Sequence, residues 1–462
     1  MKDSSDQLTW RLLVKKTLLA GAVAATLIAA PAFAQQPRLD QVLEELRALS
    51  KRVDKLEQDN TRLEAENAEL KASNDRLDAT TAYLRSNAAA TRKELAEEAP
   101  NLAKVADLEK ASKAAEWASK LSWKGDFRYR HESVDPEEAA NDQTRHRIRA
   151  RFGLTAKVTD TISTTVQLAT SGGNNDPRST NQTIGSGFDR KGVAIDLAYV
   201  DWKAADGINV QLGKLPLPFV RAGSYFWDND ITPEGGAFKL AKGPFFANAY
   251  GFWLQEAGTT SDANVVGAQL GIKQPLGPVT LTGALHYYDV GAVQGEITTT
   301  GGACTANNAF FGGPQGNTTF TGGGCARLLN DYEILEVLLQ ADMKLGSLPF
   351  SVFAQAAQNE GAVNTLDQAW AAGFTLGRAS DAMTWDFGLA YQKTEKDALF
   401  GQFVDSDFGG GFTDVEGAVL KLGFAPTKNV VINGTYFSND RFVDVGTERS
   451  YDRWQLDTSV RF

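Results

Sequence analysis

Cysteine, histidine and long apolar segments are scarce in this chain of 462 residues. It holds two Cys and three His, none at a spacing typical of a metal site, and it has no phosphate-binding loop of the Walker type. Only residues 17–34 come near the ~18–20 consecutive apolar residues that a membrane-spanning helix needs. A helical transporter with many spans is therefore excluded, and the sequence predicts neither a metal nor a cofactor.

Basic residues are not in excess either. The chain carries 47 Lys and Arg against 57 Asp and Glu, which gives a net charge of −10. The first 120 residues hold 19 of each sign, so the whole deficit lies after them. A nucleic-acid partner would want a basic surface, and neither part offers one. Because the composition changes only once, near residue 121, we predict two architectures in tandem.

The N-terminus has the pattern of an export signal. Two lysines precede an apolar stretch over residues 17–30, and Ala32-Phe33-Ala34 forms a cleavage site of the A-x-A type. We therefore predict a signal peptide over residues 1–34, with the mature protein beginning at Gln35. The alternative is an uncleaved anchor helix, which the shortness of the apolar stretch disfavours.

Export to an oxidising compartment changes what the two cysteines predict. Cys304 and Cys325 lie in one segment rich in Gly, Thr and Asn, with no metal-ligand spacing around them. We predict a disulfide between them, which would remove about 3 kcal/mol of loop freedom from the unfolded chain. The alternative is a pair of free thiols in a mobile loop.

Residues 35–121 are predicted to form a periplasmic coiled coil and a helical linker. Apolar residues and Asn recur in alternating steps of three and four over residues 39–84. This period of 3.5 residues demands a left-handed supercoil between helices, about 70 Å long, and Asn at three successive core positions fixes the register. The pattern lapses at residues 86–90, which predicts a hinge or a fraying end, and Pro100 separates a second helix over residues 102–121. The alternative is a single solvated helix.

Residues 122–462 alternate apolar with polar or small residues at a period of two, which predicts β-strands. Breaks at Gly, Pro, Asn and Asp divide this part into sixteen segments. The predicted strands are residues 122–134, 144–158, 161–171, 191–203, 208–215, 235–241, 245–257, 263–274, 279–290, 332–345, 350–359, 367–378, 384–396, 413–424, 429–438 and 450–462.

The connections between these strands alternate between short turns and long loops, as in an outer-membrane β-barrel. We therefore predict an all-β membrane protein, a 16-stranded antiparallel transmembrane β-barrel preceded by the helical coiled-coil segment. Tryptophans near the strand ends would form its interfacial girdles, namely Trp123, Trp202, Trp253, Trp370, Trp385 and Trp454. A soluble β-sandwich or propeller is the alternative, although a sandwich rarely has sixteen strands of this length.

The last residue is aromatic, Phe462, with apolar residues at alternate positions before it. This ending resembles the C-terminal signal of outer-membrane barrels, which the barrel-insertion machinery reads. Joined to an export signal, it favours the barrel over the soluble alternatives.

One wall of the predicted lumen is rich in arginine. Side chains alternate across a strand, so four arginines from residue 145 onward share one face, and two on the preceding strand continue it. Charges facing lipid would cost ~2–4 kcal/mol each near mid-depth, so this face points into the lumen. The predicted basic ladder is Arg128, Arg130, Arg145, Arg147, Arg149 and Arg151. The alternative, compatible with the first, is a structural network with lumen acids such as Asp126, Glu132, Asp196, Asp342 or Asp386.

The third long loop, residues 216–234, is aromatic and stiffened by proline, unlike a solvated surface loop. We predict that it folds into the lumen as a constriction. Its acids Asp228, Asp230 and Glu234 would lie across from the ladder, with Lys214 and Arg221 nearby. The alternative is a packed surface loop or a loop at a subunit contact.

At these residues the chain resembles the bacterial putative porin family. The resemblance is carried by residues 145–153, 166–172, 176–183, 213–219 and 227–230 with 233–235. It covers most of residues 122–462, and a coiled coil before the barrel is common in that family. The resemblance implies a homotrimeric sixteen-stranded diffusion channel, and it implies neither a solute nor a charge selectivity.

We therefore expect an outer-membrane porin of a Gram-negative bacterium, a passive channel for small hydrophilic solutes, polar or anionic, with a mild anion preference. Its partners would be outer-membrane lipid and lipopolysaccharide, the insertion machinery and further copies of the chain. The second hypothesis is a structural envelope protein, in which the barrel anchors a periplasmic spacer or tether. An enzyme would need a nucleophile and a base brought together from distant strands, and we predict no catalytic residue.

Overall fold

The computed structural model describes residues 36–98, 117–171, 176–256, 261–307 and 309–462. The predicted signal peptide, residues 1–34, and most of the predicted second helix, residues 102–121, lie outside the described residues. Within the described part, no helix is both long and apolar enough to cross a membrane.

The N-terminal segment is one helix, α2 (Gln36–Glu98). It has no Gly, and its single Pro37 stands in the first turn, where a missing N–H is tolerated. The expected hinge or fraying end at residues 86–90 is wrong, because the helix runs through this alanine-rich stretch, and Ala has the highest helix propensity. The heptad leucines Leu70, Leu77 and Leu84 are 61–62% exposed on the single chain.

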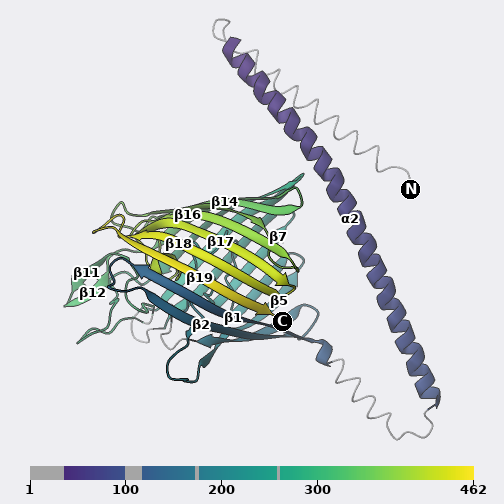
Figure 1. Cartoon of the computed structure of the whole chain (residues 1–462), viewed down its shortest axis with the longest axis horizontal. Helices are drawn as coiled ribbons and strands as arrows, with labels where there is room; N and C mark the ends of the chain where they lie inside the picture. The colour runs from purple at the N-terminus through teal and green to yellow at the C-terminus, as the bar shows by residue number, and fades with distance from the viewer. Residues whose placement is uncertain (1–35, 99–116, 172–175, 257–260, 308) are drawn as a thin grey trace. The chain divides into compact units, whose positions relative to one another are not determined.

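Most of the remaining described chain forms one closed antiparallel sheet (Figure 1). Its sixteen long strands are β1 (Leu121–Pro136), β2 (Gln143–Lys157), β3 (Ile162–Ser171), β5 (Gly192–Ala205), β6 (Ile208–Lys214), β7 (Glu234–Lys242), β8 (Phe245–Gln255), β9 (Ala263–Leu276), β10 (Val279–Gly291), β13 (Glu333–Leu345), β14 (Leu348–Asn359), β15 (Gln368–Gly377), β16 (Thr384–Thr394), β17 (Val415–Thr427), β18 (Val430–Arg441) and β19 (Arg449–Arg461). Each strand pairs with its neighbours in sequence, and β1 pairs with both β2 and β19, which closes the barrel.

The predicted sixteen-stranded barrel is confirmed, and every strand lies within three residues of its predicted bounds. Four short elements lie in the long loops: β4 (Gln182–Thr183), β11 (Thr319–Gly322), β12 (Cys325–Leu328) and η1 (Phe408–Gly410). Figure 1 shows β11 and β12 beyond one end of the barrel, on the side of the long loops. The alternation of apolar and polar residues was sufficient to locate the strands, because each strand of the barrel has one face outward and one face inward.

Outward side chains are apolar and exposed. The six girdle tryptophans are 42–67% exposed, and many Leu, Val and Phe side chains join them. The C-terminal Phe462 also points outward, 66% exposed, and its backbone pairs with Gly125 of β1 in both directions, at 2.8 and 3.0 Å. An outward apolar face with polar residues inside is the pattern of a barrel in lipid.

The hydrophobic core lies inside the barrel and is supplied largely by three loops. They are L3 (residues 215–233), L5 (residues 292–332) and L7 (residues 395–414). Their buried side chains, such as Trp227, Phe310 and Phe400, form one cluster with inward residues of β8, β9, β10 and β13 to β16. The inward faces of β1, β2 and β19 carry charged residues instead, so the two sides of the lumen differ in character.

The barrel seam can be tested by crosslinking. Phe127 of β1 faces Val460 of β19 on the outward side, so the Phe127→Cys/Val460→Cys variant should form a disulfide when an oxidant is added to outer membranes. Mass spectrometry would detect the linked peptides. Val430 of β18 pairs with Val460 and lies one strand further from β1, so Phe127→Cys/Val430→Cys should stay uncrosslinked. Efficient linkage of both pairs would contradict this register.

Candidate functional site

Six arginines share the inward face of β1 and β2. The strand register places Arg128 opposite Arg149 and Arg130 opposite Arg147, and the side chains of the predicted ladder are only 6–27% exposed. Like charges directly opposite one another destabilise a strand pair. The ladder therefore requires carboxylates close by.

Two acids on β1 supply part of this compensation. Asp126 forms ion pairs with Arg149 at 2.9 Å and with Arg151 at 2.7 Å. The fully buried Glu132 accepts a hydrogen bond from Arg145 at 2.6 Å and lies 3.5 Å from Arg147. Both acids were among those weighed in the sequence as partners in a structural network.

The buried Arg130 receives its partners from distant parts of the chain. It binds Asp457 of β19 with two nitrogen atoms, at 2.7 and 2.8 Å, and Asp407 of L7 at 2.9 Å. Asp407 also pairs with the buried Arg453 of β19. A planar guanidinium holds a carboxylate in this two-pronged way, which fixes orientation as well as charge.

Arg128 and Arg147 have the weakest carboxylate contacts of the ladder. Arg128 donates to the side-chain oxygen of Asn181 at 2.6 Å, and its nearest carboxylate, that of Asp457, lies 3.8 Å away. Arg147 donates to Ser179 at 3.3 Å and to the backbone oxygen of Asn181 at 3.4 Å. Among the described residues, the Nε atoms of both arginines have no hydrogen-bond partner.

The other acids weighed as ladder partners have different neighbours. Asp196 accepts a hydrogen bond from Gln167 at 2.7 Å, Asp342 accepts one from Gln340 at 2.9 Å, and Asp386 accepts one from the backbone N–H of Ala379 at 2.8 Å. The ladder is thus only partly neutralised by the acids that the sequence suggested.

Of the three acids expected across from the ladder, Asp230 is the one described within ion-pair distance of it, 3.7 Å from Arg149 and 3.8 Å from Arg151. Asp228 is buried and accepts the backbone N–H of Asp230 at 2.9 Å and that of Ser406 in L7 at 2.8 Å.

The placement of Glu234 across from the ladder is wrong. Glu234 begins β7, its side chain is 65% exposed, and it pairs with Lys214 at 3.2 Å. Lys214 also donates to the backbone oxygen of Thr232 at 2.9 Å. Arg221 donates to the backbone oxygen of Trp227 at 3.0 Å and lines a different cavity of about 920 Å³ beneath L3, among residues of the short turns.

Sequence reasoning missed L7. This loop also enters the lumen, where Asp405 accepts the hydroxyl of Ser224 in L3 at 2.6 Å and Asp407 pairs with Arg130 and Arg453. Its composition gave a usable signal, because L7 combines phenylalanines with closely spaced acids, as L3 does. The feature that distinguished L3 from other loops therefore applied to L7 as well.

A cavity of about 290 Å³ lies between the ladder and these two loops. Its charged lining comprises Arg128, Arg130, Arg149, Arg178 and Lys421, and Asp228, Asp230, Asp386, Asp405, Asp407 and Asp457. The lining therefore carries both signs rather than a purely basic surface. Among the residues that the structure describes, no three His, Cys, Asp or Glu are grouped as metal ligands.

The pKa values of the loop acids are shifted in opposite directions. Burial, followed by the charges of Asp405 and Asp230, raises the pKa of Asp228 well above its ordinary value. Burial and the neighbouring Asp407 likewise raise the pKa of Asp405. Burial alone would raise the pKa of Asp407 too, but Arg130 and Arg453 hold it far below its ordinary range. The stabilisation from its ion pairs is therefore complete above the ordinary carboxyl pKa and is lost only as the pH falls through that lowered value.

Comparison with solved structures shows what this architecture resembles. OprB of Pseudomonas putida, at high pH, is 15% identical with a TM-score of 0.52, covering 77% of this chain and 97% of its own. OmpT of Vibrio cholerae in its trimer form is 10% identical with a TM-score of 0.44, covering 74% and 99%. OmpF of Salmonella typhi, in complex with daunomycin, is 10% identical with a TM-score of 0.44, covering 74% and 97%. No curated protein sequence matches the chain.

The likeness to OprB shows a porin-type barrel fold, and the charged cavity stands inside it. The family follows from the sequence itself: the profile described as Putative porin matches residues 134–336 and 329–462. The chain belongs to the putative porin family.

The Asp407 ion pairs predict a stability difference between two neighbouring acids. The Asp407→Asn variant leaves the buried Arg453 without its carboxylate, so the free energy of unfolding in urea should fall by about 3 kcal/mol. Asp405→Asn is the matched control. Asp405 accepts a hydrogen bond from a serine hydroxyl, so this substitution should lower the free energy of unfolding much less. Equal losses of unfolding free energy in the two variants would contradict a stabilising role for the Asp407 ion pairs.

Proposed function

We propose that this protein is a passive diffusion channel of the outer membrane. Small hydrophilic solutes would pass between the ladder and loops L3 and L7. The observation that carries the proposal is the cavity of about 290 Å³ lined by charged side chains from both sides. A barrel of sixteen strands is wide enough for an aqueous channel, and inward loops would set its size limit.

The charge arrangement supports a mild anion preference at most. A basic wall facing acidic loops creates a transverse field, which orders water and acts on dipolar solutes. Most ladder arginines already contact carboxylates, so Arg128 and Arg147 would supply most of the attraction for an anion. Arg128 lines the charged cavity, and the side chains of Arg128 and Arg147 are 13% and 14% exposed.

Reversal potentials in a planar bilayer test this role. We expect the wild-type channel to have an anion-to-cation permeability ratio slightly above one, and the Arg128→Ala/Arg147→Ala variant to have a ratio at or below one. Arg190→Ala is a suitable control, because Arg190 lies exposed in the loop between β3 and β5. A wild-type preference for cations that the double variant leaves unchanged would remove the proposed role of the ladder.

We also propose that the protein is a homotrimer whose α2 helices associate in the periplasm. The exposed Leu70, Leu77 and Leu84 supply an apolar seam, and Asn60, Asn67 and Asn74 would fix its register. The choice of three chains rests on the family resemblance. The outward apolar face would contact lipid and lipopolysaccharide, and Phe462 would be read by the insertion machinery.

A second candidate function is structural, with the barrel anchoring a periplasmic spacer or tether. The observation that favours it is the length of α2, which at 63 residues exceeds what a simple oligomerisation helix needs.

Deleting residues 39–84 separates the two candidates. A channel protein should keep its single-channel conductance, because the lumen and its loops are built by residues after 120. A tether should lose its envelope phenotype while the barrel still assembles. Loss of conductance with an intact barrel would contradict the proposal that the barrel alone forms the channel.

A further inference from the structure

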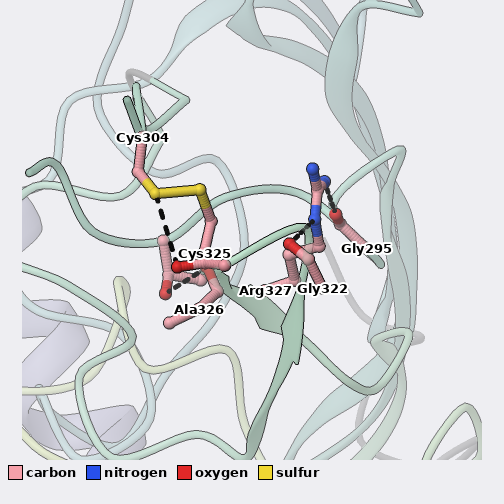
Figure 2. Close-up of a disulfide and its surroundings, with 8 residues drawn as sticks. Gly295, Cys304, Gly322, Cys325, Ala326 and Arg327 are labelled. Carbon is pink, nitrogen blue, oxygen red and sulfur yellow. Dashed lines mark hydrogen bonds between the residues drawn. A yellow bond between two sulfur atoms is a disulfide. The ribbon is translucent and has the colours of Figure 1, made fainter. Parts of the chain in front are cut away.

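L5 is a disulfide-closed loop. A disulfide joins Cys304 and Cys325 (Figure 2). Strand β11 lies between the two cysteines in the sequence, and Cys325 is the first residue of β12, with which β11 forms a hairpin. Figure 2 also shows Arg327, whose side chain donates to the backbone oxygens of Gly322 at 3.1 Å and Gly295 at 2.7 Å. The hairpin is thus fastened to the start of L5.

Within this closed ring, Asn317 is bound to L7. Its side chain is 4% exposed and donates to the backbone oxygens of Lys396 at 3.0 Å and Leu399 at 2.9 Å. Its own oxygen accepts the backbone N–H of Gly401 at 2.7 Å. One amide of L5 therefore bonds three backbone groups of L7, of which the oxygen of Lys396 also accepts the hydroxyl of Thr413 at 2.7 Å.

The next residue continues the contact. Thr318 donates to the carboxylate of Asp397 in L7 through its N–H at 2.8 Å and its hydroxyl at 2.6 Å. Asp397 is fully buried. A charged acceptor makes hydrogen bonds roughly twice as strong as neutral ones.

The two backbones approach so closely that side chains are excluded. A Cβ on Gly401 would lie 2.5 Å from the backbone oxygen of Gln315, and a Cβ on Gly316, at φ +95°, would lie 2.6 Å from that of Thr413. Glycine at both positions permits a complementary fit between L5 and L7.

L7 leads from this contact directly into the lumen. The backbone oxygen of Phe403 accepts the N–H of Asp228 at 2.8 Å, and the next acids, Asp405 and Asp407, reach Ser224 and Arg130. Asp405 and Asp407, which line the charged cavity, thus lie four and six positions after Gly401, which contacts L5.

We propose that L5, through Asn317 and the ring closed by Cys304 and Cys325, positions L7 so that Asp405 and Asp407 stand in the channel. Asn317 is a positioning residue that never contacts a solute. The proposal rests on the channel function proposed above. Without the contact, L7 is held only by its ion pairs and its apolar packing, so it shifts in the lumen, the passage widens, and Arg130 and Arg453 are less closely paired with Asp407.

Single-channel recording of the full-length protein tests this. The Asn317→Ala variant should conduct more than wild type and shift its reversal potential toward anions, and Gly401→Ala should do the same from the L7 side. Simple destabilisation would lower the number of channels without this directed shift. The matched control is Asn307→Ala, because the side chain of Asn307 accepts only a local N–H, that of Ala309 at 2.8 Å, among its described hydrogen bonds.

The outcomes separate the two proposals. If wild type forms no channel, the proposed function fails. If wild type conducts and an assembled Asn317→Ala variant matches it in conductance and reversal potential, the positioning role is overturned.

If heat-modifiable migration in gel electrophoresis shows that neither variant assembles, the proposal is tested by adding a reductant to the wild-type channel during recording. Opening of the ring should raise its conductance, and an unchanged trace under conditions that mass spectrometry shows to reduce the disulfide would overturn the proposal.

Discussion

Six arginines on two adjacent strands impose the condition on which the lumen depends, because closely packed and mostly buried cations must each find negative charge. The neighbouring strand residues Asp126 and Glu132 meet only part of this need. The rest comes from β19 and from loops L3 and L7, which the arginines thereby hold inside the barrel. The same ion pairs therefore neutralise the arginines of the wall and hold the loops in position.

On the opposite side of the lumen, apolar packing holds the loops instead of ion pairs. Aromatic residues of L3, L5 and L7 need an apolar surface, and the inward faces of β8 to β10 and β13 to β16 contribute Tyr, Phe and Ala to it. The loops are therefore held between two unlike walls, by burial on one side and by ion pairs on the other. The cavity of about 290 Å³ lies on the charged side, between the ladder and loops L3 and L7.

Sequence reasoning recovered the sixteen strands because alternation is a local property of the chain. The same property placed all six ladder arginines on one inward face. It could not supply their partners, since the pairing of Arg130 with Asp457 spans 327 residues and exists only after closure. L3 was recognised by its composition, whereas the similar composition of L7 was overlooked. Glu234 was misplaced because the loop ends one residue earlier and this side chain belongs to β7.

The burial of the ladder's ion pairs has a consequence for ionic strength. Dissolved ions screen exposed charges within about 8 Å at physiological salt but act weakly on pairs shielded from solvent. Concentrated salt should therefore erase any discrimination between permeating ions long before it detaches the loops from the wall. In a salt-rich medium the loops would therefore keep their places against the wall, because their ion pairs lie where dissolved ions act least.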